Sequence, residues 1–206
     1  MAPDFHTCRH TVLFYRDAGA VRASVTGYVE AALRAGHPAL VIARPELAHD
    51  LTIELHRCHV HGRPFGPDRG ELLVLDAEAT LDSLCLAGRP DEARFREVVG
   101  AALASLATGH KRVAAYGEMV GVLCERGRYA DAVHLESLWN ALLAESDASL
   151  FCGYPRHLFQ PPEARGFYEQ IRAAHAETLD DEDGAGPTGT YPSRAGARAC
   201  ASSARE

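Results

Sequence analysis

A complete strand–helix–strand unit is predicted by residues 111–155, KRVAAYGEMVGVLCERGRYADAVHLESLWNALLAESDASLFCGYP. The runs 113–116 and 149–152 are short and apolar, as in the buried strands of a parallel sheet. Between them, apolar residues recur every three or four positions, as in helices, and Gly127 divides this region into two helices. Trp139 lies in the apolar stripe of the second helix, so we expect it in the core.

The same alternation extends toward the N-terminus. Apolar runs at 11–15, 38–43 and 72–75 predict three further strands, and helical patterns separate them. The predicted helices cover residues 20–35, 45–59, 77–86 and 91–108. Five short strands alternating with helices predict an α/β fold, a mostly parallel, doubly wound sheet with helices on both faces.

The C-terminal part of the chain divides into two segments. Residues 161–178 begin with two prolines, and the pattern after them, from Glu163 to Thr178, predicts a helix that docks through Phe167, Tyr168 and Ile171. Residues 179–206 contain almost no large apolar side chains, so we expect a disordered tail. The predicted organisation is one domain over residues 8–160, a C-terminal helix over 161–178 and the tail over 179–206.

Composition restricts the class of protein. The chain has 206 residues, 47% of them hydrophobic, and a formal net charge of −7, which argues against direct binding to nucleic acid. It contains neither an apolar run of the ~20 residues needed to cross a bilayer nor a secretory signal. Six scattered cysteines without a CxxC pair predict reduced thiols. We therefore expect a cytoplasmic protein that does not bind membranes.

Motifs for catalysis are missing from the expected places. The first strand is followed by RDAGAVRAS, without the GxxxxGK[ST] that a phosphate loop requires. No serine or cysteine lies on a GxSxG turn, so we predict neither enzymatic activity nor a cofactor. A metal is not assigned either. The group His56, Cys58, His59 and His61 is compatible with solvated imidazoles at a helix end or with metal ligation.

A candidate ligand site is predicted at one edge of the sheet. Right-handed crossovers bring the carboxyl ends of all parallel strands to the same edge, where ligands bind in open α/β sheets. Asp17, Asp76, Glu118 and Tyr154 follow or end four of these strands. Glu118 alone is equally compatible with accepting hydrogen bonds from the backbone of a turn. Glu136 and Asn140 lie one helical turn apart, so they share a face.

Several blocks of the sequence, in this order, resemble the MEDS domain, the sensory domain associated with methanogens, methylotrophs and the dichloromethane-regulator protein. The blocks are HTVLFYRD at 10–17, a helix ending at Gly36 before PALVIA, GELLVLD at 70–76, GEMV at 117–120, LESLWN at 135–140 and LFCGYP at 150–155. The similarity runs from about His10 to Phe159. The residues at the polar motif positions of the family are His10, Tyr15, Asp17, Glu118, Glu136, Asn140 and Tyr154.

The resemblance implies a prokaryotic signalling module that senses small, hydrocarbon-derived molecules, with a sheet similar to that of RecA and KaiC ATPases without the phosphate loop. Such modules are often joined to histidine kinases or DNA-binding domains. We expect this chain to bind a small molecule and to signal in trans to a histidine kinase, an anti-sigma factor or a transcription regulator, and a homodimer is compatible with this expectation. The alternatives are a pure protein–protein interaction module and a degenerate ATPase that still binds nucleotide.

Overall fold

The computed structural model describes residues 2–7, 9–57, 71–107, 109 and 112–180. Its centre is a sheet of six parallel strands in the order β3-β2-β6-β7-β1-β8. The strands are β1 His10–Tyr15, β2 Ala39–Ala43, β3 Leu72–Asp76, β6 Val113–Gly117, β7 Ala148–Pro155 and β8 Glu177–Asp180. Five of them match the predicted apolar runs, and the α/β class with helices on both faces is confirmed.

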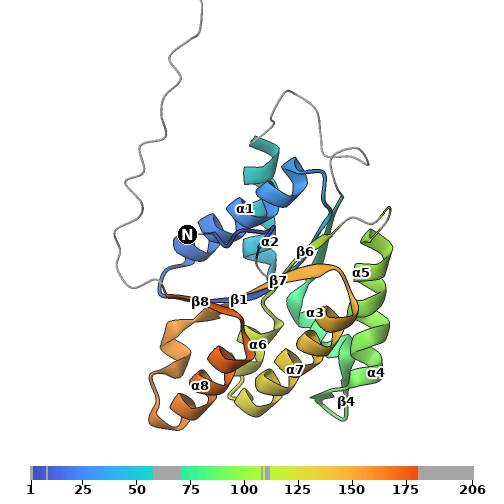
Figure 1. The fold of residues 1–206 in the computed structure, drawn as a ribbon. Helices are drawn as coiled ribbons and strands as arrows, with labels where there is room; N and C mark the ends of the chain where they lie inside the picture. The colour runs from blue at the N-terminus through green and yellow to red at the C-terminus, as the bar shows by residue number, and fades with distance from the viewer. Residues whose placement is uncertain (1, 8, 58–70, 108, 110–111, 181–206) are drawn as a thin grey trace, which may run out of the picture.

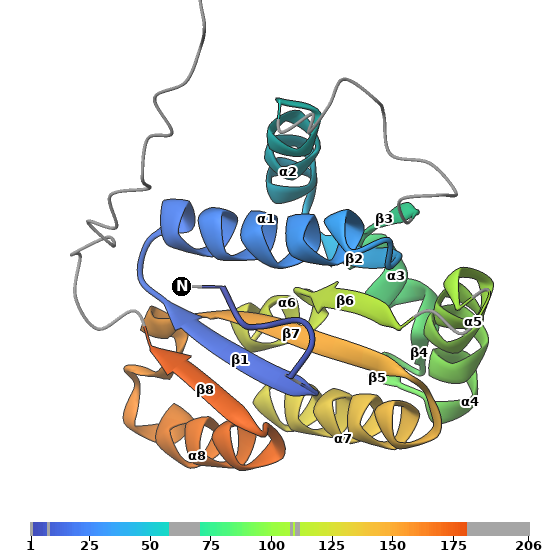
Figure 2. The same ribbon diagram turned by 45° about the horizontal axis from the view of Figure 1, so that its top comes forward.

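Two helices cover one face of the sheet, α1 Ala18–Arg34 and α2 Pro45–Arg57 (Figures 1 and 2). The apolar stripes of both helices pack on the strand residues that point toward this face. Tyr28 of α1 is 0% exposed. The phenol of Tyr28 contacts both the carbonyl and the hydroxyl of Ser149 on β7, at 3.1 and 2.7 Å. This face is therefore a closed, well-packed core.

The opposite face carries the remaining helices (Figure 2). They are α3 Ala77–Leu84, α4 Glu92–Phe95, α5 Ala101–Leu106, α6 Met119–Glu125, α7 Tyr129–Glu145 and α8 Arg165–Ala174. Trp139 of α7 is 1% exposed and contacts the ring of Phe95 edge-on, as expected for a core residue. Gly127 separates α6 from α7 at a φ of 70°, a conformation that glycine adopts without strain.

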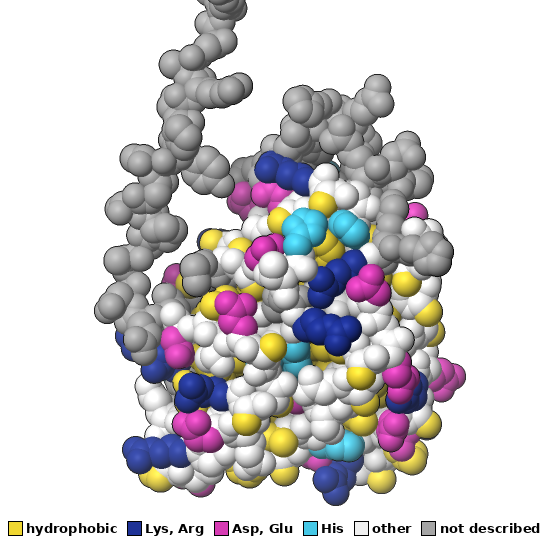
Figure 3. Space-filling model, in the orientation of Figure 1, with side chains coloured by type: hydrophobic (Ala, Val, Ile, Leu, Met, Phe, Trp, Pro, Cys, Tyr) yellow, Lys and Arg dark blue, Asp and Glu magenta, His cyan; other side chains and the backbone are white. Residues whose placement is uncertain are grey.

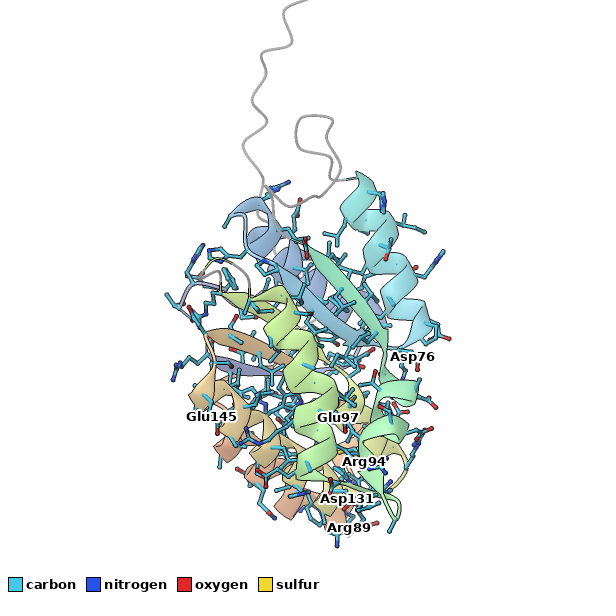
Figure 4. All side chains as sticks on the ribbon, turned by 90° about the vertical axis from the view of Figure 1, so that its right-hand side faces the viewer. Asp76, Arg89, Arg94, Glu97, Asp131 and Glu145 are labelled. Carbon is cyan, nitrogen blue, oxygen red and sulfur yellow. The ribbon has the colours of Figure 1, made fainter. Side chains whose placement is uncertain are left out.

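Two local predictions were wrong in detail. The helix expected over residues 91–108 contains a π-helical turn, Arg96–Gly100, between α4 and α5. The helix expected over residues 77–86 ends at Leu84. The chain then forms a two-stranded antiparallel ribbon, β4 Cys85–Leu86 with β5 Arg89–Pro90. Arg89 at this ribbon lies 3.0 Å from Asp131 on α7, and this ion pair anchors the ribbon to the helix (Figure 4).

The sixth strand was not predicted. Helix α8 ends at Ala174, short of the expected residue 178, and β8 then pairs in parallel with β1. Leu179 and Asp180, which were expected in the tail, belong to this strand. The burial pattern explains the omission, because Leu179 is the one buried residue of β8, too little to produce an apolar run. Residues 181–206 lie outside the described residues.

On the face shown in Figure 3, basic and acidic side chains are interspersed. Among the described residues, Cys85, Cys124 and Cys152 form no disulfide. Within the part of the chain that the structure describes, the helices are too short or too polar to span a membrane.

Candidate functional site

The eight residues predicted for the ligand site fall into three groups. Two of them, Asp17 and Asp76, cap helices. The Asp17 carboxylate accepts from the backbone N–H of Ala20 at 3.2 Å, and that of Asp76 accepts from Ala79 at 2.7 Å (Figure 4). Both are N-cap positions, where Asp satisfies amides that the helix leaves unpaired.

The connection capped by Asp17 differs from a phosphate-binding loop. Strand β1 ends at Tyr15 and α1 begins at Ala18, so only two residues connect them. A phosphate loop needs a longer turn whose backbone amides surround the phosphate. Here the N-terminus of α1 already has a carboxylate as its acceptor.

Tyr15 and Glu118 form the second group, at the carboxyl edge of the sheet. Glu118 follows β6, is 5% exposed, and accepts the backbone N–H of Arg44 at 2.7 Å. Burial raises the pKa of Glu118, although the hydrogen bond from Arg44 opposes this. Burial also raises the pKa of Tyr15, and the nearby Glu118 carboxylate adds to that increase. Glu118 thus links the end of β6 to the start of α2, as the turn-forming interpretation predicts.

The third group is a hydrogen-bonded cluster beneath the sheet, between β1, β7 and α7. His10, Glu136, Asn140 and Tyr154 belong to it. The Tyr154 hydroxyl donates to Oε1 of Glu136 at 2.6 Å, and Nε2 of His10 lies 3.3 Å from Oε2 of the same carboxylate. Asn140 Oδ1 lies 2.9 Å from Nδ1 of His10. The structure therefore brings together four residues that are up to 144 positions apart, between His10 and Tyr154.

Two residues outside the predicted set complete this cluster. Cys152 lies two residues before Tyr154 on β7, so the two side chains share a face of the sheet. Its Sγ is 3.6 Å from Nε2 of His10 and 3.8 Å from Oε2 of Glu136. His175, in the turn between α8 and β8, places Nε2 3.5 Å from Oε1 of Glu136, and its ring centroid is 3.9 Å from that of His10.

The electrostatics of the cluster centre on Glu136, which is 0% exposed. Burial by itself would raise the pKa of Glu136, but the imidazoles of His175 and His10 and the Tyr154 hydroxyl outweigh it and lower the pKa to about 2. Burial lowers the pKa of His175. Burial raises the pKa of Tyr154, and the adjacent Glu136 carboxylate adds to this effect. The cluster thus centres on a buried carboxylate that accepts a hydrogen bond from the Tyr154 hydroxyl and faces two imidazoles.

Two cavities lie near these groups. The larger, about 600 Å³, is at the carboxyl edge beside β1 and β7 and is lined by Arg16, Arg156, His157, Phe159, Gln160 and Tyr168. The smaller, about 330 Å³, lies at the opposite end of β1, where its lining includes His10, Asn140 and His175. The smaller cavity therefore borders both imidazoles of the buried cluster.

Sequence patterns missed His175 and most of the residues that line the larger cavity. His175 was assigned to the C-terminal helix, and only the turn after α8 points it inward. The burial of Glu136, by contrast, has a signal in the sequence. Glu136 lies four residues after Ala132 and three before Trp139, within the apolar stripe of α7. In the proposed histidine–cysteine group, His56 has its Nδ1 2.6 Å from the carbonyl of Thr52. Residues 58, 59 and 61 lie outside the described residues.

Comparisons with known proteins were consistent with the resemblance noted in the sequence. A family model described as MEDS, "MEthanogen/methylotroph, DcmR Sensory domain", matches residues 9–175. A solved structure described as a structural study of a protein from Pyrococcus horikoshii OT3 has a TM-score of 0.45 and 12% identity, covering 85% of this chain and 82% of that chain. No curated protein matches the sequence significantly.

Proposed function

This chain belongs to the MEDS family of sensory domains, and we propose that it is a cytoplasmic, non-enzymatic sensor that binds a small organic molecule in the cavity at the carboxyl edge of its sheet. The match covers residues 9–175, which is nearly all of the described chain. The description of the family supports a role in signalling. The ligand and its location are our proposal.

The observation that carries this proposal is the position and lining of the larger cavity. Its volume of about 600 Å³ suits a small ligand. Arg16 directly follows β1 and Arg156 directly follows β7, so the cavity lies where parallel sheets bind ligands. The sequence analysis expected the ligand site at this same edge of the sheet, with mostly other side chains than those that line the cavity.

The chemistry of the lining indicates the type of ligand. Arg16 makes no ion pair with the described residues, and Arg156 lies 3.2 Å from Asp180 on β8. The rings of Phe159 and Tyr168 lie 5.5 Å apart and supply an apolar wall. A ligand with a short hydrocarbon body and an anionic group would contact both kinds of surface, because guanidinium groups bind carboxylates through paired hydrogen bonds.

Sensing also requires two states with different affinities for the ligand. Three elements surround the cavity, the end of β1, the turn after β7 and α8. A ligand that contacts both Arg16 and Tyr168 of α8 would favour one arrangement of these elements over another. We propose that a histidine kinase, an anti-sigma factor or a transcription regulator recognises one of the two arrangements in trans.

Thermal denaturation with a panel of short-chain carboxylates tests this proposal. Alcohols and chlorinated alkanes of the same chain length serve as neutral comparisons. A carboxylate at 100 times its Kd should stabilise the protein by about 2.7 kcal/mol. The Arg156→Gln variant should lose this effect. The Arg96→Gln variant should keep it, because Arg96 pairs with Glu145 far from the cavity.

Each alternative predicts a different result. Stabilisation by Mg-ATP, and not by the carboxylates, would indicate a nucleotide-binding degenerate ATPase. No stabilisation by any compound would contradict the sensor and favour an interaction module. Equal loss of the response in both arginine variants would contradict the assignment to this cavity.

A further inference from the structure

Four potential metal ligands converge in the buried cluster between β1, β7, α7 and the turn after α8. They are His10, Glu136, Cys152 and His175, all buried, and one ligand atom from each lies within 4.8 Å of the other three. The set contains two imidazoles, a carboxylate and a thiol, which are the groups that bind Zn²⁺ in proteins. Neither the proposed function nor the family description accounts for this convergence.

The hydrogen bonds of the two imidazoles direct both Nε2 atoms toward Glu136. Asn140 donates its amide hydrogen to the carbonyl of Ala174 at 2.9 Å, so its Oδ1 faces His10 and can only accept. His10 must therefore donate through Nδ1. His175 likewise donates through Nδ1, because its partner at 2.6 Å is the carbonyl of Ile171. In neutral imidazoles this leaves a lone pair on each Nε2.

Three electron-rich groups then surround one point. The side chain of His175 is 0% exposed, and its Nε2 has no hydrogen-bond partner. A proton on His10 would satisfy the contact between His10 and Glu136 but would leave Nε2 of His175 facing the carboxylate. Buried polar atoms are rarely left in this state. A cation between the four groups satisfies all of them.

The distances are close to those of a tetrahedral site. With bonds of about 2.0–2.3 Å, a tetrahedral Zn²⁺ separates neighbouring ligand atoms by roughly 3.3–3.6 Å. The observed separations from Nε2 of His10 are 3.3 Å to Glu136 Oε2 and 3.6 Å to Cys152 Sγ, and Cys152 Sγ is 3.8 Å from the same carboxylate oxygen. Shifts of about 1 Å bring all four atoms to tetrahedral spacing.

We propose that His10, Glu136, Cys152 and His175 bind one divalent transition-metal ion of the Zn²⁺ type, with Asn140 and Tyr154 positioning the ligands. Asn140 orients the imidazole of His10, and the Tyr154 hydroxyl holds the carboxylate of Glu136 at 2.6 Å. Hydrogen bonds from neighbouring side chains to the metal ligands are a regular feature of metal sites in proteins.

Binding has a defined proton balance, and a cavity of about 330 Å³ borders the site, since His10, Asn140 and His175 belong to its lining. The Cys152 thiol loses its proton when it ligates the ion, so a proton is released for each ion bound. The ion would connect the turn between α8 and β8 to β1, β7 and α7, so its binding should stabilise the position of this turn.

Cobalt absorption spectroscopy of the full-length chain tests the site directly. After dialysis against a chelator and its removal, the protein is titrated with Co²⁺ and then with Zn²⁺. We expect one ion per chain, visible bands of tetrahedral Co²⁺, a near-ultraviolet thiolate-to-cobalt band, and displacement of Co²⁺ by Zn²⁺. The thiolate band needs no variant, so it tests the proposal even if substitutions disturb folding.

Matched variants locate the ion. Cys152→Ser should abolish the thiolate band and Cys124→Ser, at another buried thiol, should keep it. His175→Gln should weaken Zn²⁺ binding by more than the roughly 10- to 100-fold expected for Asn140→Ala. His134→Gln, on the exposed side of α7, should have no effect.

Three outcomes contradict the proposal. The first is a folded wild-type chain that binds no Co²⁺ or Zn²⁺, which would leave a protonated histidine as the partner of Glu136. The second is bound Co²⁺ without a thiolate band. The third is binding that survives His175→Gln and Cys152→Ser but is lost on His59→Gln, which would place the ion at the other histidine group.

Discussion

Three buried tyrosines make the electrostatic description of the cluster measurable. Tyr154, Tyr28 and Tyr116 are each 0% exposed, but their hydroxyls differ in what they contact. Tyr154 donates to the carboxylate of Glu136 at 2.6 Å, whereas Tyr28 contacts neutral groups of Ser149. The hydroxyl of Tyr116 has no hydrogen-bond partner. Substitution by phenylalanine removes one oxygen atom in each case and leaves the ring in place.

The expected costs follow from these partners. Tyr154→Phe should lower the free energy of unfolding by about 1.5–3 kcal/mol, as for a hydrogen bond to a charged group. Tyr28→Phe should cost about 0.5–1.5 kcal/mol, as for neutral partners. Tyr116→Phe should leave the free energy of unfolding unchanged or raise it, by at most about 3 kcal/mol, because an unpaired buried hydroxyl is removed.

Urea denaturation of the metal-free protein measures all three. Trp139 is the only tryptophan, and its fluorescence reports on the core. Equal m-values for the variants would show that the differences are changes in stability. If Tyr154→Phe costs no more than Tyr28→Phe, Glu136 is not an ionised carboxylate in the folded protein and our account of the cluster is wrong.

Four other substitutions test other parts of the fold. Trp139→Ala should lower the free energy of unfolding by about 3–5 kcal/mol, measured by circular dichroism in urea, because it empties a large core position. Gly153→Ala should cost about 1–3 kcal/mol, since the new Cβ would lie 2.7 Å from the Tyr116 hydroxyl, and Tyr116→Phe in the same chain should restore part of that loss. Asp76→Ala removes the N-cap of α3 and should cost about 0.5–2 kcal/mol in the same assay, without changing the response to carboxylates. Glu118 binds its proton more tightly in the folded than in the unfolded chain, so between its ordinary pKa of about 4.3 and the raised folded value it should make stability fall as pH rises. Glu118→Gln should remove this contribution in denaturation curves measured across that range, and an unchanged pH dependence would contradict the assignment.

The strands and most helices could be predicted from the sequence because each produces a local signal. Buried parallel strands are continuous apolar runs, and glycines such as Gly36 and Gly127 mark helix ends. Strand β8 gives no such signal, because it lies at the edge of the sheet with one buried residue, Leu179. Pairing with β1, a non-local interaction, makes it a strand.

The site was less predictable, because its geometry depends on how helices rotate against the sheet. The sequence placed Tyr154 at the carboxyl edge, where β7 does end, but the side chain points beneath the sheet toward Glu136. His10 and Asn140 were named through the family resemblance, and their contact requires α7 to cross the start of β1. No local pattern distinguishes His175 from other polar residues near a helix end.

The proposed ligand cavity can be tested most directly by two-dimensional NMR of the uniformly ¹⁵N-labelled chain, titrated with the carboxylate that stabilises it most. We expect saturable shifts confined to Arg16, the turn Arg156–Phe159, Gln160 and α8, which surround the cavity at the carboxyl edge. Shifts around α1 and α2 instead, or no shifts at any concentration, would contradict the account of this protein as a sensor that binds its ligand there.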